Sequence, residues 1–325
     1  MRRLTYVEAL NEALHQLLEG DDRVIVMGQG VTSPWYVGNS CIGLIDRFTE
    51  SRVLDTPVSE NAVTGAAVGA ALAGMRPILV HPRLDFMHYA MDPIANQASN
   101  WHYMFGGKLS VPVTIWGIIN RGGEQGAQHS QATHSIYAHL PGIKVIMPST
   151  PYDVKGMLRA SVYDGNPVVF VDDRWLYRIE GDVPEKRYKV EIGKGKVRRK
   201  GKDVTIVATS YLVHEALSAA EELAVKGISA EVLDPLTLKP LDEGLIVKSV
   251  SKTGRLLVVD GGWSSFGAAA EIMARVAENK EIMEIKAPLK RVALPDSPAP
   301  ASRTLEKNYF KRAEDIVREA AKLVR

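Results

Sequence analysis

The sequence predicts an α/β protein of two domains, each built on a mostly parallel sheet flanked by helices. Continuous apolar runs, which read as buried strands, alternate with helix-like stretches along the chain, as is typical of such sheets. The alternation stops once, in a charged and glycine-rich segment, and then resumes. At 325 residues the chain is long enough for two domains of ordinary size. We therefore predict a first domain over residues 1–180, a linker over 181–202 and a second domain over 203–325.

The predicted elements follow from apolar runs, helical spacing and the residues that bound them. In the first domain, strands are predicted at 24–30, 76–82, 111–118 and 166–173, and helices at 1–20, 60–75 and 151–165. Pro151 and Gly165 suit the start and the end of the last of these helices. In the second domain, strands are predicted at 203–210, 228–235 and 255–262, and helices at 211–227, 266–278 and 308–325.

The composition is that of a soluble globular protein, with 46% hydrophobic and 24% charged residues. The net charge of +2 is too small to favour nucleic acid or an anionic membrane as a partner. A single cysteine, Cys41, excludes an intramolecular disulfide and indicates a reducing compartment. No segment approaches the roughly 18 apolar residues of a membrane span. We expect a cytoplasmic protein that binds neither nucleic acid nor membranes.

Chemistry is expected in the loops after residues 30, 82 and 118, because parallel sheets bind ligands at the carboxyl ends of their strands. None of these loops carries a GxGxxG or P-loop pattern, which argues against a nucleotide site. Glu60 follows Ser59 at a predicted helix start. From the residues alone, a favourable position near the helix dipole is a better explanation of Glu60 than catalysis is.

Three histidines, at 129, 134 and 139, raise the alternative of a zinc site. The last two are five residues apart, a spacing that does not place both on one helical face, and no carboxylate or cysteine completes a recognisable ligand pattern. We therefore do not expect zinc.

Several segments resemble the β subunits of thiamine-diphosphate-dependent 2-oxoacid dehydrogenases, which act on pyruvate, branched-chain 2-oxoacids or acetoin. They are DTPVSENAVTGAAVGAALAGMRPI (55–78), GAQHSQ (126–131), HLPGIKVIMPSTPYDVKGML (139–158), NPVVF (166–170) and SVSKTGRLLVVD (249–260). The resemblance covers almost the whole chain. It implies a transketolase-like pyrimidine-binding domain followed by a transketolase C-terminal domain. The implied reaction is oxidative decarboxylation of a 2-oxoacid, with transfer of the acyl group to lipoamide.

The resemblance also implies roles for individual residues. Glu60 would hydrogen-bond a ring nitrogen of the aminopyrimidine and so favour the tautomer that deprotonates the thiazolium carbon. Val58 would pack against the pyrimidine, Phe86 would stack on it, and Tyr89 would lie one helical turn further along the same site. His129 matches an active-site histidine that stabilises the decarboxylation product and guides acyl transfer.

The sequence carries only half of such a site, because it has no GDG motif to hold Mg²⁺ and the diphosphate. By resemblance, an α subunit supplies that half in an assembly of two α and two β chains, and this chain alone is inactive. Gly65 and Gly69 lie one turn apart on the helix after Glu60 and permit close approach of another backbone. We favour packing against a partner subunit over packing within this chain. The second domain would make subunit contacts and dock to a lipoyl acyltransferase core.

Some points stay open at this level. Ser161, Asp164 and Asn166 match positions where some relatives bind a monovalent cation such as K⁺ through backbone oxygens, but a helix end and turn explain them equally well. The segments His81-Pro82-Arg83 and Asp92-Pro93 depart from the family pattern, which leaves the substrate and the acceptor undetermined. Two alternative functions remain: a split transketolase-like enzyme that transfers carbon to an aldehyde, and a non-catalytic assembly subunit.

Overall fold

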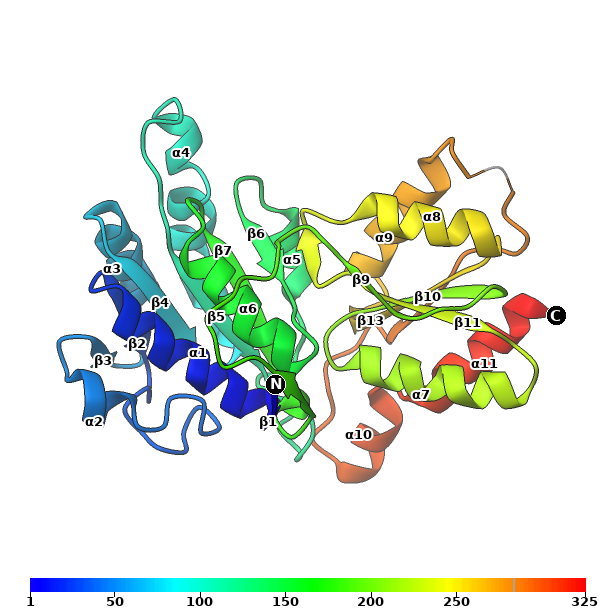
Figure 1. The fold of residues 1–325 in the computed structure, drawn as a ribbon, viewed down its shortest axis with the longest axis horizontal. Coiled ribbons are helices and arrows are strands. Elements are labelled where there is room, and N and C mark those ends of the chain that lie inside the picture. Colours follow the sequence, from blue (N-terminus) through cyan, green and yellow to red (C-terminus); the bar gives the residue numbers. More distant parts are fainter. Residues whose placement is uncertain (283) are drawn as a thin grey trace.

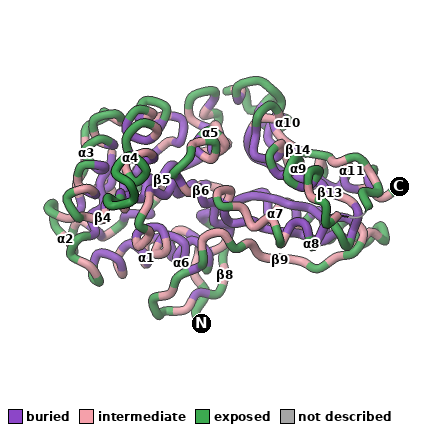
Figure 2. Tube along the Cα trace, turned by 90° about the horizontal axis from the view of Figure 1, so that it is seen from above, coloured by how far each residue is buried: buried purple, intermediate pink, exposed green. Residues whose placement is uncertain are grey.

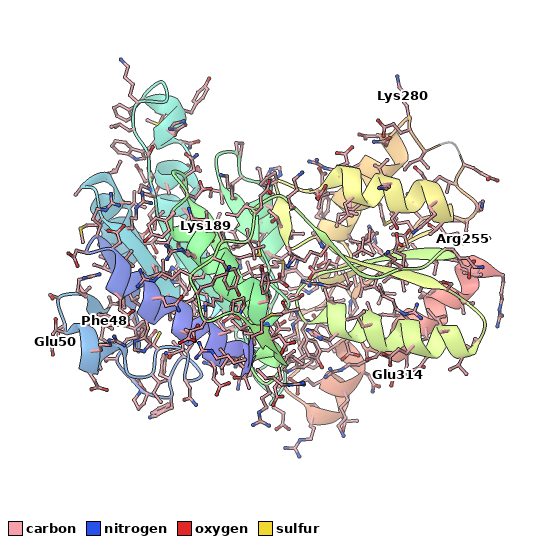
Figure 3. The ribbon with its side chains drawn as sticks, in the orientation of Figure 1. Phe48, Glu50, Lys189, Arg255, Lys280 and Glu314 are labelled. Carbon is pink, nitrogen blue, oxygen red and sulfur yellow. The ribbon has the colours of Figure 1, made fainter. Side chains whose placement is uncertain are left out.

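The computed structural model, which describes residues 1–282 and 284–325, contains two α/β domains side by side (Figure 1). Figure 2 shows the buried residues concentrated in the sheets and the exposed ones in the outer loops and helices. Charged side chains such as Glu50 and Lys280 project from the surface of the two domains (Figure 3). Within the described residues, no helix is long and apolar enough to cross a membrane.

The first domain is built on a seven-stranded sheet. Its strands, in spatial order, are β12 (Thr237–Lys239), β6 (Lys144–Ile146), β7 (Val168–Asp173), β5 (Thr114–Ile119), β4 (Arg76–His81), β2 (Val24–Gly28) and β3 (Val53–Asp55). All neighbours run parallel except β12, which pairs antiparallel with β6. The strand β12 comes from the second half of the chain, so this sheet is completed across the predicted domain boundary.

Helices cover both faces of this sheet. They are α1 (Tyr6–Gly20), α2 (Leu44–Phe48), α3 (Glu60–Leu72), η1 (Leu84–Ala90, a 3₁₀ helix), η2 (Asp92–Ala98, a π-helix), α4 (Trp101–Met104), α5 (His134–His139), α6 (Pro151–Val162) and η3 (Arg174–Leu176, a 3₁₀ helix). Alternate residues of β2 face opposite sides. Val24 and Val26 pack in the core that contains α1 and α6, whereas Ile25 and Met27 pack in the core that contains α3 and η1.

The N-terminal helix begins later than predicted. Residues 2–5 form β1 (Arg2–Thr5), which pairs antiparallel with β8 (Glu180–Val183). Thr5 then caps α1 through a capping box, in which its hydroxyl accepts from the Glu8 amide and the Glu8 carboxylate accepts from the Thr5 amide. The distant partner β8 therefore decides the structure of these first residues.

The second domain has a five-stranded sheet between two helical layers. Its strands, in spatial order, are β14 (Lys290–Leu294), β13 (Leu256–Trp263), β10 (Val204–Ala208), β11 (Ala230–Asp234) and β9 (Lys196–Arg199). Its helices are α7 (Leu212–Val225), α8 (Glu243–Thr253), α9 (Ala268–Glu278), α10 (Arg303–Tyr309) and α11 (Ala313–Val324). The helices α7 and α11 share one core with the sheet, and α8 and α9 share the other.

The single helix predicted over 308–325 is wrong, because the chain forms α10 and α11 with a break between them. Phe310 turns inward at the break and packs edge-on against Trp175 of the first domain, with ring centroids 5.4 Å apart. Burial of this ring between the domains outweighs continuation of the helix.

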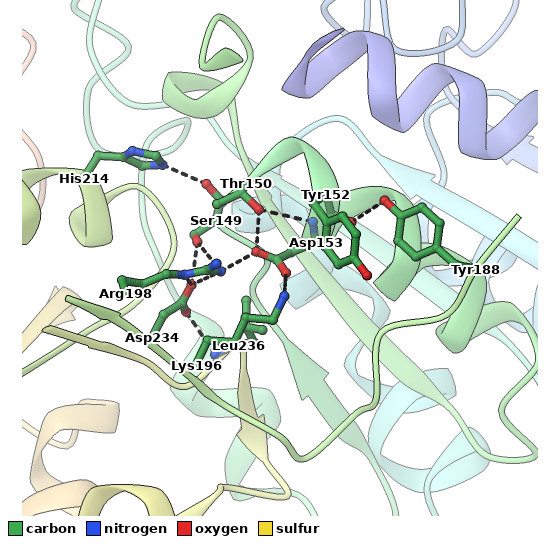
Figure 4. Close-up of polar contacts among 10 residues, drawn as sticks. All are labelled: Ser149, Thr150, Tyr152, Asp153, Tyr188, Lys196, Arg198, His214, Asp234 and Leu236. Carbon is green, nitrogen blue, oxygen red and sulfur yellow. Dashed lines mark hydrogen bonds and ion pairs between the residues drawn. The ribbon is translucent and has the colours of Figure 1, made fainter. Parts of the chain in front are cut away.

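The segment predicted as a linker carries β9 and the last residues of β8. From β9, Arg198 reaches into a buried polar network between the domains (Figure 4). Its guanidinium pairs with Asp153 of α6 and, at 2.7 Å, with Asp234 at the end of β11. Ser149 donates to Asp234 at 2.5 Å, and both carboxylates are fully buried. The two domains are therefore joined by charge pairing in their interior as well as by the chain.

Candidate active site

The loops at the carboxyl ends of β2, β3 and β4 surround a small, open cavity of about 20 Å³ that includes Glu60. Its lining consists of Gly28, Gln29, residues 56–60, Val63 and residues 79–82. Gly28 permits this arrangement, because its φ is +148° and a Cβ there would lie 2.3 Å from the Val80 carbonyl oxygen. A carboxylate and apolar side chains thus share one small cavity at the predicted edge of the sheet.

Asp55, at the end of β3, holds the neighbouring loop in place. Its carboxylate accepts hydrogen bonds from the Gly30 amide at 2.8 Å and from the Thr32 hydroxyl at 2.6 Å. Sequence reasoning did not single out this residue. Its position directly after the apolar residues Val53 and Leu54 was the available signal.

The side of the cavity formed by the start of α3 is open. Val58 is 68% exposed and Glu60 is only partly buried. Gly65 and Gly69 lie on the exposed face of α3, and a Cβ on either would meet no described atom within 4 Å. The alternative of tight packing inside this chain is therefore excluded for these glycines, and the face is free to receive another chain.

Phe86 of η1 and His129 of the loop after β5 lie in contact. Their ring centroids are 5.1 Å apart and the ring planes meet at 83°, an edge-to-face arrangement. Two residues that were predicted separately are thus brought together on the same edge of the sheet. Tyr89 is 74% exposed, so its predicted place at the site stays a prediction.

Asp85 fixes the loop that carries His129. Its side chain is buried, and one carboxylate oxygen accepts from both the backbone amide (3.2 Å) and the side-chain amide (2.8 Å) of Gln131. Burial raises the pKa of Asp85, while the hydrogen bonds from Gln131 oppose that rise. Sequence reasoning missed this residue, although an acid in an otherwise apolar segment was visible.

Comparison with known proteins decides the family. Residues 2–180 match the transketolase pyrimidine-binding domain and residues 193–316 match the transketolase C-terminal domain. The chain is 42% identical, over all of its length and 98% of the relative, to the acetoin:2,6-dichlorophenolindophenol oxidoreductase subunit beta of Cupriavidus necator. It is also 38% identical to the pyruvate dehydrogenase E1 component subunit beta of Bacillus subtilis, over 100% of this chain and 99% of that one. The chain belongs to the transketolase-like β subunits of the thiamine-dependent 2-oxoacid dehydrogenases.

One further relative of this β subunit agrees with that assignment, and one solved structure agrees with the fold. The 2-oxoisovalerate dehydrogenase subunit beta of Bacillus subtilis is 39% identical, over 98% of either chain. A solved structure described as a split gene transketolase, inactive beta4 tetramer, matches with a TM-score of 0.79 at 22% identity. That match covers 99% of this chain and 98% of the solved one. The predicted fold class, two α/β domains with mostly parallel sheets, is confirmed.

The residues that line the cavity of this β subunit match the chemistry of the pyrimidine half of thiamine diphosphate. An aminopyrimidine has apolar faces and a hydrogen-bonding edge, and the cavity pairs the Glu60 carboxylate with apolar Val58 and Val63. The flat ring of Phe86 lies further along the same edge of the sheet.

His81 is a buried neutral base beside this cavity. It is 3% exposed, and its Nε2 lies 3.2 Å from the Thr64 hydroxyl of α3. Burial lowers the pKa of His81 from 6.5 to about 4, because the charged imidazolium would lose its hydration. His81, which departs from the family pattern, therefore adds a polar but uncharged side chain to the lining of the cavity.

We expect His81 to make the protein sensitive to acid. Its folded pKa is depressed, so the unfolded chain binds more protons between pH 4 and 6.5, and stability falls as the pH drops through that window. The full effect is about 3 kcal/mol. Denaturant titrations from pH 7 to 4 should show the wild type losing more stability than His81→Gln. Parallel curves for the two proteins would contradict this.

The side chains at the predicted cation site are engaged within the chain. Asp164 pairs with the Lys144 ammonium at 2.5 Å and accepts from the Asn166 amide at 2.9 Å. The Ser161 hydroxyl donates to the Met157 carbonyl at 2.8 Å. These contacts match the alternative of a helix end and turn, but they involve side chains. The predicted ligands are backbone oxygens, so the monovalent-cation site stays a prediction.

The three histidines do not form a metal site. His134 is buried and bonds Asp260 of β13 at 2.9 Å, linking the two domains. His129 instead contacts Phe86. Over residues 1–282 and 284–325, no group of three or more histidine, cysteine or acidic side chains could hold a metal ion.

Proposed function

We propose that this β subunit forms, with an α subunit, an enzyme that uses thiamine diphosphate to oxidise a 2-oxoacid with loss of CO₂. The acyl group passes to lipoamide. The observation that carries the proposal is the position of Glu60, at the first turn of α3, in a cavity that is open on the side where another chain would close it. The full-length similarity to β subunits of such dehydrogenases supports it.

Each side chain of the proposed site has a definite task in this reaction. Thiamine diphosphate, when bound, supplies a nucleophilic carbon. The Glu60 carboxyl group holds and returns a proton at the ring nitrogen of the pyrimidine. His129 donates a hydrogen bond to the charge that develops on the substrate, and the Phe86 edge fixes the plane of its ring. Asp85 holds the loop that carries His129 in place through its hydrogen bonds with Gln131.

The α subunit is proposed to hold Mg²⁺ and the diphosphate, in an assembly of two α and two β chains. The exposed face of α3 around Gly65 and Gly69 supports such a contact, because small residues allow helices to approach closely. Docking of the assembly to a lipoyl acyltransferase core is part of the same proposal.

Reconstitution with the α subunit tests the proposal. Neither chain alone should oxidise a 2-oxoacid with an artificial electron acceptor, and the mixture should do so only with thiamine diphosphate and Mg²⁺. The panel should contain pyruvate, branched-chain 2-oxoacids and acetoin. Transfer of carbon from a ketose phosphate to an aldehyde, without oxidation of any 2-oxoacid, would instead establish the transketolase-like alternative.

A further inference from the structure

Three arginines lie at the carboxyl edge of the first sheet, and only one of them has an acidic partner. Arg121 pairs with buried Asp173 at 2.7 Å. Arg83, just after β4, and Arg174, just after β7, form no ion pair with any described acid within 4.0 Å. Two guanidinium charges therefore remain without a counter-ion beside the proposed active site.

Both charges are held in place by neutral groups. Arg83 donates to the Pro82 carbonyl at 2.7 Å and to the Gln125 side-chain oxygen at 3.4 Å. Arg174 donates to the Tyr36 carbonyl at 2.8 Å. In each case the Nε–H is buried and has no hydrogen-bond partner among the described residues. A buried donor without a partner is costly, and the cost falls when a ligand accepts from it.

The two guanidinium groups also repel each other. The pKa of Arg83 is lowered first by burial and next by the charge of Arg174, whose effect exceeds the opposing attraction of Asp85. Asp85 offsets this repulsion only in part, and one of its oxygens already accepts from Gln131. A partly buried pair of like charges is stabilised by an anion that binds between or beside them.

Both arginines are connected to the cavity that contains Glu60. Pro82, the residue before it, lines the cavity of Glu60. Gln125, which accepts from Arg83, belongs to the loop that carries His129, and Asn120 anchors it at 2.9 Å. On the other side, Tyr36 connects Arg174 to Gln29 of the same cavity, because Gln29 donates to the Tyr36 hydroxyl at 2.8 Å.

We infer that Arg83 and Arg174 form an anion subsite that binds a carboxylate of the substrate, so that this enzyme selects a charged 2-oxoacid over neutral acetoin. The inference rests on the proposed function and narrows its substrate class. A guanidinium fork suits a carboxylate, which it can bind through two parallel hydrogen bonds. The family departure at Arg83 is then a specificity determinant.

The first test needs only this chain and inorganic sulfate as the probe. Sulfate stabilises most proteins by exclusion from their surface, so its effect is compared with chloride at equal ionic strength and across variants. The extra rise in Tm with sulfate should be larger for the wild type than for Arg83→Met. Arg291→Met, which removes an exposed arginine of β14, is the matched control and should behave as the wild type. Equal sulfate effects in all three proteins would overturn the subsite.

The second test uses the complex with the α subunit. The ratio of kcat/KM for pyruvate or 2-oxoglutarate to that for acetoin should fall by at least about tenfold in Arg83→Met, which is the loss expected for a charge-assisted hydrogen bond. Arg83→Lys keeps the charge without the fork and should fall less. An unchanged ratio would overturn the inference, as would weaker binding of thiamine diphosphate without a change in ratio, since that result would assign the site to the diphosphate. A wild-type complex inactive on every substrate would refute the proposed function instead, while the sulfate test would still judge the subsite.

Discussion

Replacing Glu60 with glutamine is expected to lower kcat of the reconstituted enzyme by at least about a hundredfold, the usual contribution of a positioned acid or base. The glutamine side chain fills the same place at the start of α3 but cannot hold and return a proton. Because Glu60 is only partly buried and the Ser59 side chain makes no capping bond, the fold should not depend on it. Turnover of the preferred 2-oxoacid with an artificial acceptor measures the effect.

Glu50→Gln provides the matched control, because Glu50 lies on the surface of the same domain (Figure 3) and outside the cavity. Both variants should assemble with the α subunit and unfold close to the wild-type Tm. Full activity of the Glu60→Gln protein in the complex would refute the assignment and support a non-catalytic assembly role.

Replacing Arg198 with methionine should give the largest loss of stability, about 3–5 kcal/mol, because it leaves buried carboxylates without their main cation. Asp234 would keep only neutral donors, Ser149 and the Leu236 amide. Asp153 would keep Lys196, whose side chain is 35% exposed and whose charge is therefore partly screened by water. The free energy of unfolding from denaturant titration measures the loss.

The loss in Arg198→Met should depend on pH. Burial raises the pKa of Asp234, and the charge of Arg198 opposes that rise. Without Arg198 the folded pKa lies further above the unfolded value, so the variant loses stability as the pH rises through the folded pKa and recovers it toward pH 4. The Lys196→Met control should cost much less, because this pair is more exposed. A loss that is equal at pH 5 and pH 8 would contradict this account.

The elements that depend on local pattern were predictable from the sequence. The buried strands β2, β4 and β7 contain continuous apolar runs. Such runs are typical of the strands of a parallel sheet, which are buried on both faces. Glu60 was found at the start of α3 because the segment around it resembles a known family. Phe86 and His129 were each predicted in the same way, and the structure adds that they touch.

The features that sequence reasoning missed depend on partners far along the chain. The first residues become β1 only because β8 lies beside them. The break between α10 and α11 follows from the contact of Phe310 with Trp175 of the other domain. The role of Asp85 depends on its hydrogen bond with Gln131, which is 46 residues away in the sequence. No local pattern records such a pairing, so these features appear only once the chain is folded.

The strand β12 has a consequence for how the protein unfolds. It hydrogen-bonds to β6, so the sheet of the first domain ends in a strand that the second half of the chain contributes. A first half produced without residues 196–325 would lack both this strand and Arg198. The backbone groups of β6 would then be open to solvent or to a neighbouring molecule, and Asp153 would have no guanidinium partner. The two halves are thus expected to unfold in one cooperative transition. Neither half is expected to fold when it is expressed alone.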